Sequence, residues 1–254
     1  MRRYRDRVNW HCRAGFNKYR ALGECTDTAD GPLIHIDNGG QILAVAHLDA
    51  VGFGKPTWKG DRVQCMQLDD RLGVWVLLDL LPSLGCVPFD ILLTDSEEVG
   101  RSTAQYLDAE IASRYNWMFE FDRAGSDCVM YDYEDEETTT LAEQYGWAVG
   151  YGSFTDICSL EHAGIKGFNF GTGYHNQHTH QCYADLSETI ASAKRFVDMA
   201  ADLHKVRLEH AATEWYDAYS DRNEICTYCG ELLDREWYYC PMCGTVVAHH
   251  CDSV

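Results

Sequence analysis

The stretch from Ile42 to Asp49 constrains this chain most, because an apolar run leads directly into a histidine and an aspartate. Five consecutive aliphatic residues, ending at Ala46, are typical of a strand buried on both faces of a sheet. Such a strand delivers His47 and Asp49 to the carboxyl edge of the sheet, where open α/β folds place their sites. Asp49 can then hold one nitrogen of His47 while the other binds a metal. A hydrogen-bonded pair is the simpler interpretation unless further ligands follow.

Two further apolar segments end in acidic residues. Phe89–Thr94 is followed by Glu97 and Glu98, and Asn116–Phe121 is followed by Asp122. Adjacent carboxylates at a strand end point to different sides, so one can bind a metal while the other acts as a base. A solvated acidic loop is the alternative.

A buried helix is predicted between the Ile42–Asp49 stretch and the Phe89–Thr94 segment. The apolar run Val74–Leu81 is closed by Pro82 and opens at Asp69 and Asp70. Acidic residues at a helix start are either caps or functional carboxylates, and the sequence leaves both interpretations open.

Three histidines gather in one downstream loop, as His175, His178 and His180. The loop leads to Asp185, which predicts a capping box with Glu188 at the start of a long amphipathic helix. Any of the three histidines can serve as a ligand on this pattern.

Other segments frame the predicted sheet. Residues 1–22 have a loose amphipathic helix pattern, which we expect to cover one edge of the core. The turn signal at Asp37–Gly40 predicts a hairpin between Leu33–Ile36 and the central strand. Asp156 is a candidate cap for a helix over 157–163.

Together these elements predict an α/β fold with a mixed, mostly parallel central sheet flanked by helices. The 254 residues carry 21 Lys and Arg against 40 Asp and Glu, a formal net charge of −19. This charge repels phosphate backbones and anionic membranes, so we expect no nucleic-acid and no membrane partner. Twelve cysteines without an apolar signal segment after Met1 favour free thiols in a reducing compartment. We therefore expect a soluble, cytoplasmic protein.

The C-terminal segment changes character. It carries two Cys-x-x-Cys-Gly patterns, formed by Cys226, Cys229, Cys240 and Cys243. Four thiolates at this spacing predict one structural Zn²⁺ in a ribbon-like module over 225–254, with free thiols as the alternative. A polar linker over 209–224 separates this module from a catalytic domain over 1–208.

The remaining candidates form one set of oxygen and nitrogen ligands at strand and helix ends. The set comprises His47, Asp69, Glu98, Asp122 and one histidine of the 175–180 loop. It suits two zinc ions that share a carboxylate, with Glu97 left to manage a water between them.

In this ordered set the sequence resembles the co-catalytic di-zinc exopeptidases, which include leucyl-type and tetrahedral aminopeptidases. The motifs that carry the resemblance are Ala46–Asp49, Leu68–Gly73, Ser96–Gly100, Phe121–Arg123 and His178 with Asp185–Leu186. The resemblance covers residues 33 to about 205 and implies a zinc exopeptidase-like fold for the catalytic domain.

The resemblance also implies a role for each residue. His47 and Asp122 would hold one zinc, Glu98 and His178 the other, and Asp69 would bridge them. Asp49 would orient His47, and Glu97 would be the general base. A cis peptide is expected between Asp69 and Asp70. His175 and His180 stay open as replacements for His178, and so do other divalent metals.

The activity implied is hydrolysis of an amide bond, most simply by an aminopeptidase acting on peptides. A non-peptide amidase or deacylase, a carboxypeptidase on the same scaffold, and an inactive binding protein that uses the zinc ribbon are the alternatives. Only Ala50–Leu68 separates the first histidine from Asp69, which leaves no room for the lid domain of tetrahedral aminopeptidases. A protein partner of the zinc ribbon and an oligomer are further possibilities.

Overall fold

The computed structural model describes residues 2–211, 224–225 and 232–233. The chain divides into two compact units after Ala211. In the second unit, β12 (Glu224–Ile225) and β13 (Leu232–Leu233) pair as antiparallel strands. The four cysteines predicted to bind a structural zinc, and most of the predicted linker, lie outside the described residues.

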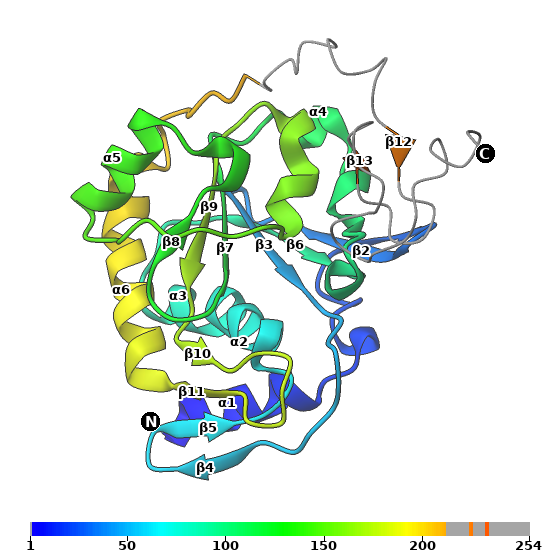
Figure 1. Cartoon of the computed structure of the whole chain (residues 1–254), viewed down its shortest axis with the longest axis vertical. Helices are drawn as coiled ribbons and strands as arrows, with labels where there is room; N and C mark the ends of the chain where they lie inside the picture. The colour runs from blue at the N-terminus through cyan, green and yellow to red at the C-terminus, as the bar shows by residue number, and fades with distance from the viewer. Residues whose placement is uncertain (1, 212–223, 226–231, 234–254) are drawn as a thin grey trace, which may run out of the picture. The chain divides into compact units, whose positions relative to one another are not determined.

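A seven-stranded sheet forms the centre of the first unit (Figure 1). Its order is β1-β2-β6-β3-β7-β9-β8, and the four strands β6, β3, β7 and β9 run parallel. The outer pairs are antiparallel. The sheet is therefore mixed, with a parallel centre, as the sequence predicted. The strands are β1 (Glu24–Thr28), β2 (Gly31–Ile36), β3 (Leu43–His47), β6 (Asp90–Thr94), β7 (Met118–Arg123), β8 (Cys128–Val129) and β9 (Gly167–Gly171).

The predicted hairpin between Leu33–Ile36 and the central strand is wrong. β6 lies between β2 and β3 and pairs with both. The turn at Asp37–Gly40 packs against the start of β6 instead. The Asp90 carboxylate accepts hydrogen bonds from the backbone N–H groups of Asn38 and Gly40, each at 2.8 Å. A Cβ at Gly40 would stand 2.3 Å from Phe89 Cα, so this glycine serves a close approach to the next strand.

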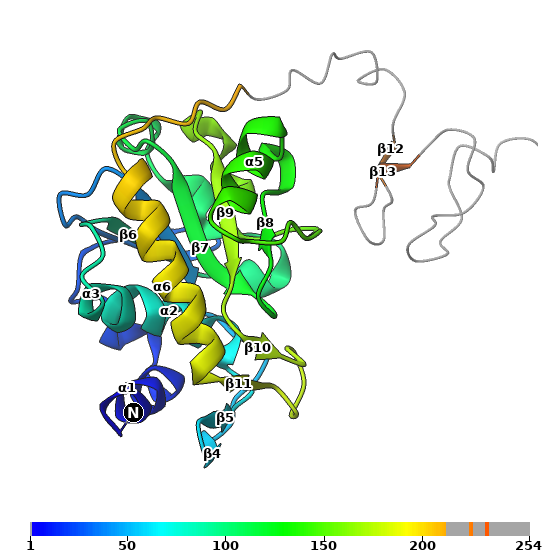
Figure 2. The same cartoon turned by 90° about the vertical axis from the view of Figure 1, so that its left-hand side faces the viewer.

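Helices cover both faces of the sheet (Figure 2). On one face, α2 (Leu68–Trp75) packs on β3 and β7, and α6 (Leu186–Leu203) packs on β9. α2 continues through the π-helical segment η2 (Val76–Leu80) into α3 (Leu81–Ser83). The 3₁₀ segment η4 (Thr103–Tyr106) packs on β2 and β6, the 3₁₀ segment η6 (Asp156–Ala163) packs on β3 and β7, and α4 (Ala109–Ala112) packs on η6. α5 (Glu136–Gln144) lies at the β8 end of the sheet, where Tyr145 just after it donates a hydrogen bond of 2.9 Å to Asp202 of α6.

Aromatic side chains fill the space between the sheet and α6. Phe196 projects from α6 and packs on Phe119 of β7 with ring centroids 4.3 Å apart, and Phe121 and Phe170 also contact it. The long amphipathic helix forms as predicted, and its buried residues, among them Leu186, Phe196 and Met199, recur three or four positions apart along α6.

The N-terminal segment is helical over a shorter range than predicted. α1 (Arg2–Arg13) ends before the short 3₁₀ turn η1 (Phe16–Lys18), and it packs on α2. Val8, His11 and Cys12 are its buried residues. Among the described residues, no helix has the length and apolar character needed to cross a membrane.

A small antiparallel sheet lies beside the main one, in the order β10-β11-β5-β4. Its strands are β10 (Tyr174–His175), β11 (Tyr183–Asp185), β5 (Arg62–Gln64) and β4 (Thr57–Lys59). The β4–β5 pair fills the short span between β3 and α2, and β11 fixes the end of the histidine loop. The predicted capping box at Asp185 does not form: its carboxylate pairs with Arg62 at 2.7 Å, and Glu188 pairs with His175 at 3.0 Å.

Candidate metal centre

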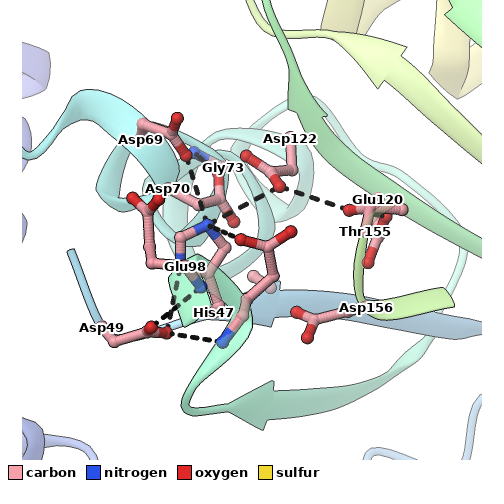
Figure 3. A network of polar contacts seen from close by, with 12 residues as sticks. His47, Asp49, Asp69, Asp70, Gly73, Glu98, Glu120, Asp122, Thr155 and Asp156 are labelled. Carbon is pink, nitrogen blue, oxygen red and sulfur yellow. Dashed lines mark hydrogen bonds and ion pairs between the residues drawn. The ribbon is translucent and has the colours of Figure 1, made fainter. Parts of the chain in front are cut away.

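The carboxyl ends of three parallel strands meet at one edge of the main sheet, because β6, β3 and β7 are neighbours. His47 is the last residue of β3, and Asp122 lies near the end of β7. Glu97 and Glu98 follow β6 in the 3₁₀ turn η3 (Glu97–Val99). Figure 3 shows that several of these side chains converge on His47.

His47 is fully buried and is surrounded by carboxylates. Its Nε2 atom lies 3.2 Å from Asp69 Oδ1, 3.6 Å from Asp122 Oδ2 and 3.8 Å from Glu97 Oε2. On the opposite side of the ring, Nδ1 lies 3.3 Å from Asp49 Oδ1. One ring nitrogen therefore faces the cluster while the other faces an orienting carboxylate, as a metal-ligating histidine requires.

Asp69 presents its two oxygens to two different histidines. Oδ1 faces His47, and Oδ2 lies 3.1 Å from His178 Nε2. The same His178 nitrogen lies 3.0 Å from Glu98 Oε2. The Asp69 carboxylate thus lies between His47 and His178, with one oxygen facing each.

The sequence left open whether Asp69 and Asp70 are helix caps or functional carboxylates, and in the structure the two residues differ in this respect. The peptide bond between them is cis, as expected, and neither residue has helical backbone angles. Asp70 Oδ1 accepts a hydrogen bond from the Gly73 backbone N–H at 3.0 Å, as a cap does, whereas Asp69 faces the cluster. A Cβ at Gly73 would stand 2.2 Å from Asp70 Oδ1 and 2.4 Å from the Phe121 carbonyl oxygen, so only glycine fits there.

Asp49 joins β3 to the turn that carries the two glutamates. Its carboxylate accepts hydrogen bonds from the backbone N–H of Glu97 at 3.3 Å and of Glu98 at 3.1 Å. The same carboxylate lies beside His47. Asp49 therefore fixes the histidine and the glutamate turn relative to each other.

Only His178 of the three loop histidines reaches this cluster. It has a left-handed backbone, with φ 59°, and its side chain is 54% exposed. His175 pairs with Glu188 instead, and His180 contributes its backbone carbonyl to Gln64.

The site carries an excess of negative charge. Burial, together with the charge of Asp122, raises the pKa of Glu97 to about 9. Burial and the charge of Asp69 raise the pKa of Asp122 to about 7. Burial by itself lowers the pKa of His47, yet the surrounding carboxylates, Asp122 foremost, raise it well above its ordinary value. A bound cation relieves such crowding of carboxylates.

The donor atoms fit divalent metal ions. Two groups have ligand atoms that all lie within 4.8 Å of one another, namely His47, Glu97, Asp122 and His47, Asp69, Glu98. Imidazole nitrogen and carboxylate oxygen are ligands that zinc takes in proteins. His47 belongs to both groups. Glu97 lies in the group with His47 and Asp122, so this geometry allows Glu97 to bind a metal there as well as to act beside it.

Sequence reasoning missed a second layer of polar residues behind Asp122. Glu120, fully buried on β7, accepts hydrogen bonds from Thr155 Oγ1 at 2.8 Å and from the Ile157 backbone N–H at 3.1 Å. The Thr155 hydroxyl also lies 3.3 Å from Asp122 Oδ2 (Figure 3), and Tyr174 donates to Asp122 Oδ1 at 3.1 Å. A glutamate two positions before Asp122 in an apolar strand was the available signal.

Asp156 is not the helix cap that the sequence predicted. Its buried carboxylate accepts hydrogen bonds from the hydroxyls of Thr94, at 2.6 Å, and Ser102. η6 therefore begins without a side-chain cap. The carboxylate instead ties η6 to the end of β6 and to the start of η4.

No family model matches the sequence, and no curated protein matches it. Solved structures of similar fold include the aminopeptidase PepT from Bacillus cereus, with 13% identity and a TM-score of 0.60 over 80% of this chain and 99% of that one. A tripeptidase from Staphylococcus aureus has 10% identity and a TM-score of 0.60 over 80% and 98%. The TET1 peptidase of Pyrococcus horikoshii, which can assemble into a tetrahedron or a large octahedral shell, has 13% identity and a TM-score of 0.52 over 78% and 99%. The first unit thus has the fold of TET and PepT aminopeptidases.

Proposed function

We propose that this protein is a di-zinc hydrolase that cleaves amide bonds, and specifically an aminopeptidase acting on peptides. The observation that carries the proposal is the Asp69 carboxylate, whose oxygens face His47 at 3.2 Å and His178 at 3.1 Å. Asp122 completes the first metal position and Glu98 the second. The shared fold with aminopeptidases supports a peptide substrate.

The chain's own residues supply the proton transfers. Bound zinc would polarise the scissile carbonyl and make water more acidic. Glu97, beside the first group of ligands, takes the proton of the attacking water and returns it to the leaving amine. Asp49 holds His47 in position, and the Tyr174 hydroxyl fixes Asp122.

Two further assignments rest mainly on sequence. We assign one structural zinc to the cysteines at 226, 229, 240 and 243, because their spacing is typical of such sites. We assign the protein to the cytoplasm on the expectation from the sequence that its cysteines are thiols in a reducing compartment.

Metal analysis and a substrate panel on the purified full chain test the function. We expect three zinc ions per chain and hydrolysis of aminoacyl amides with a free amine. Blocking that amine with an acetyl group should abolish hydrolysis. A metal-loaded protein that cleaves only N-acylated substrates would be a deacylase or a carboxypeptidase.

The general base is tested by Glu97→Gln with Glu98→Gln as its matched neighbour. Loss of a base lowers the rate by about 10²-fold to 10⁴-fold. We expect this loss in Glu97→Gln with both site metals retained, and loss of a metal in Glu98→Gln. A Glu97→Gln variant as fast as the parent would show that Glu97 is not the base.

A further inference from the structure

A cleft opens directly beside the metal centre. Its volume is about 370 Å³, and its floor includes Asp69, Glu97 and Asp122. The remaining walls come from the end of β7, Tyr131, residues 151–154 and the segment of the loop histidines. A substrate residue next to the scissile bond has to occupy this space.

Four aromatic residues line the cleft beyond the metal centre, alongside small and polar ones. They are Tyr131, Tyr151, Phe154 and Tyr174. The Tyr151 side chain is 86% exposed at the rim, and the Tyr131 hydroxyl accepts a hydrogen bond from Asn169 at 3.1 Å. Such rings bind apolar and aromatic groups well.

Arg123 is the one Lys or Arg side chain lining the cleft within the described part of the chain, and it is already paired. Its Nε lies 3.0 Å from Asp127 Oδ1 and its Nη2 lies 3.0 Å from Asp127 Oδ2. This two-point contact neutralises the charge of Arg123 and occupies the Nε–Nη2 edge of its guanidinium, one of the two edges with which it could bind a substrate carboxylate.

The pair is held in a fixed backbone. The Asp127 carbonyl accepts a hydrogen bond from Gly171 N–H at 2.7 Å, and the Arg123 carbonyl accepts one from Thr172 N–H at 2.8 Å. Gly150 packs against the pair so closely that a Cβ there would stand 2.0 Å from Asp127 Oδ2. Arg123 cannot turn to a substrate without leaving the Asp127 charge half-buried and unpaired.

We propose that Asp127 is a specificity-determining residue: it keeps Arg123 from binding substrate carboxylates, so the cleft accepts neutral apolar or aromatic side chains next to the scissile bond and rejects acidic ones. This inference rests on the proposed function. It concerns residues outside the metal ligands and the base.

The test compares aminoacyl amides on the metal-loaded full chain. For the parent we expect kcat/KM for phenylalanyl, tyrosyl and leucyl amides to exceed that for glutamyl and aspartyl amides by about tenfold or more, which is the scale of one charged hydrogen bond. Asp127→Asn frees Arg123 and should raise kcat/KM for glutamyl amides by about tenfold.

Two controls isolate the ion pair. The double variant Arg123→Gln/Asp127→Asn should return the low rate on glutamyl amides, and Asp127→Glu should keep the parent preference. Calorimetry with free glutamate as the probe should detect binding only in Asp127→Asn.

Each outcome has a distinct meaning. A parent that prefers glutamyl, aspartyl or lysyl amides overturns the inference even if no variant folds, and so does a folded Asp127→Asn without a gain on glutamyl amides. Failure of the loaded parent to cleave any amide overturns the proposed function instead.

Discussion

Two buried histidines in this protein lie in opposite electrostatic settings. His11 on α1 has one partner for each ring nitrogen: Tyr19 Oη at 3.0 Å from Nδ1 and Asp79 Oδ2 at 2.7 Å from Nε2. Arg7 balances Asp79 through a hydrogen bond of 2.8 Å. His47, in contrast, faces three carboxylates with one nitrogen.

The difference distinguishes a structural histidine from a candidate metal ligand. Around His11 the charges cancel within the protein, and burial lowers its pKa despite the contact with Asp79. Around His47 the negative charges exceed what the protein neutralises, and a bound cation would balance them. A buried histidine beside an aspartate therefore indicates a candidate metal ligand only when the other charged groups around it leave an excess of negative charge.

The largest expected effect is on activity, in the matched pair His47→Gln and His11→Gln. Loss of a residue that merely orients a ligand costs up to about 100-fold in metal affinity or activity, and loss of the ligand itself should cost at least as much. We expect His47→Gln to lose metal and hydrolysis, and His11→Gln to keep both. Similar metal content and kcat/KM in the two variants would contradict the comparison.

The second effect is on the free energy of unfolding of His11→Gln, which should fall although its activity is unchanged. Replacing it with Gln disturbs hydrogen bonds to Tyr19 and Asp79 in a buried site, which should cost about 1–3 kcal/mol. Urea unfolding of His11→Gln against the parent measures this free energy. A variant as stable as the parent would mean that the His11 contacts contribute little to folding.

A smaller effect is expected on the pH dependence of stability. The groups that face His11 are Tyr19, Asp79, Arg7 and Arg71, and its pKa in the folded state is lowered, chiefly by burial. The unfolded chain therefore takes up this proton first as pH falls through about 6.5, and the folded state loses stability below that value. The stability difference between parent and His11→Gln should shrink between about pH 8 and 5.5. A constant difference would rule out this linkage.

The smallest effect is expected from removal of the second unit. Residues 209–210 are the last part of the first unit to contact the sheet region, through the Ile165–Glu209 bridge and the His210 N–H to Gly164 oxygen hydrogen bond of 3.1 Å, so a cut after Ala211 leaves these contacts in place. A chain cut after Ala211 should fold, lose one zinc and hydrolyse small amides at the parent rate, because four thiolates leave no open position on a structural zinc. A folded, di-zinc truncated chain without activity would place the cysteine module in the active site.

The sequence predicted the gathering of His47, Asp69, Glu97, Glu98 and Asp122, because parallel strands bring their carboxyl ends to one edge of the sheet. Their assignment as ligands and base stays a prediction.

Other expectations failed where a local signal had a distant partner. The turn before β3 packs against β6 instead of closing a hairpin, and Asp156 and Asp185 bind side chains far along the chain instead of capping the next helix. Long-range partners of this kind leave no local pattern. Glu120 was recognisable as a charge inside an apolar strand, but not as the acceptor for Thr155.

The position of β6 between β2 and β3 also determines when the strands of the nascent chain can pair. β3 ends at residue 47 and β6 begins at residue 90, 43 positions later, which at roughly 5–20 residues per second is a delay of about 2–9 s; β2 ends earlier still, at residue 36. β2 can pair with β1 in that time, whereas β3, buried over its whole length in the finished sheet, has no partner strand until β6 and β7 follow. The strand that carries His47 therefore stays without its partner strands until β6 and β7 have been made, and the proposed ligand set is complete only once His178 has been made.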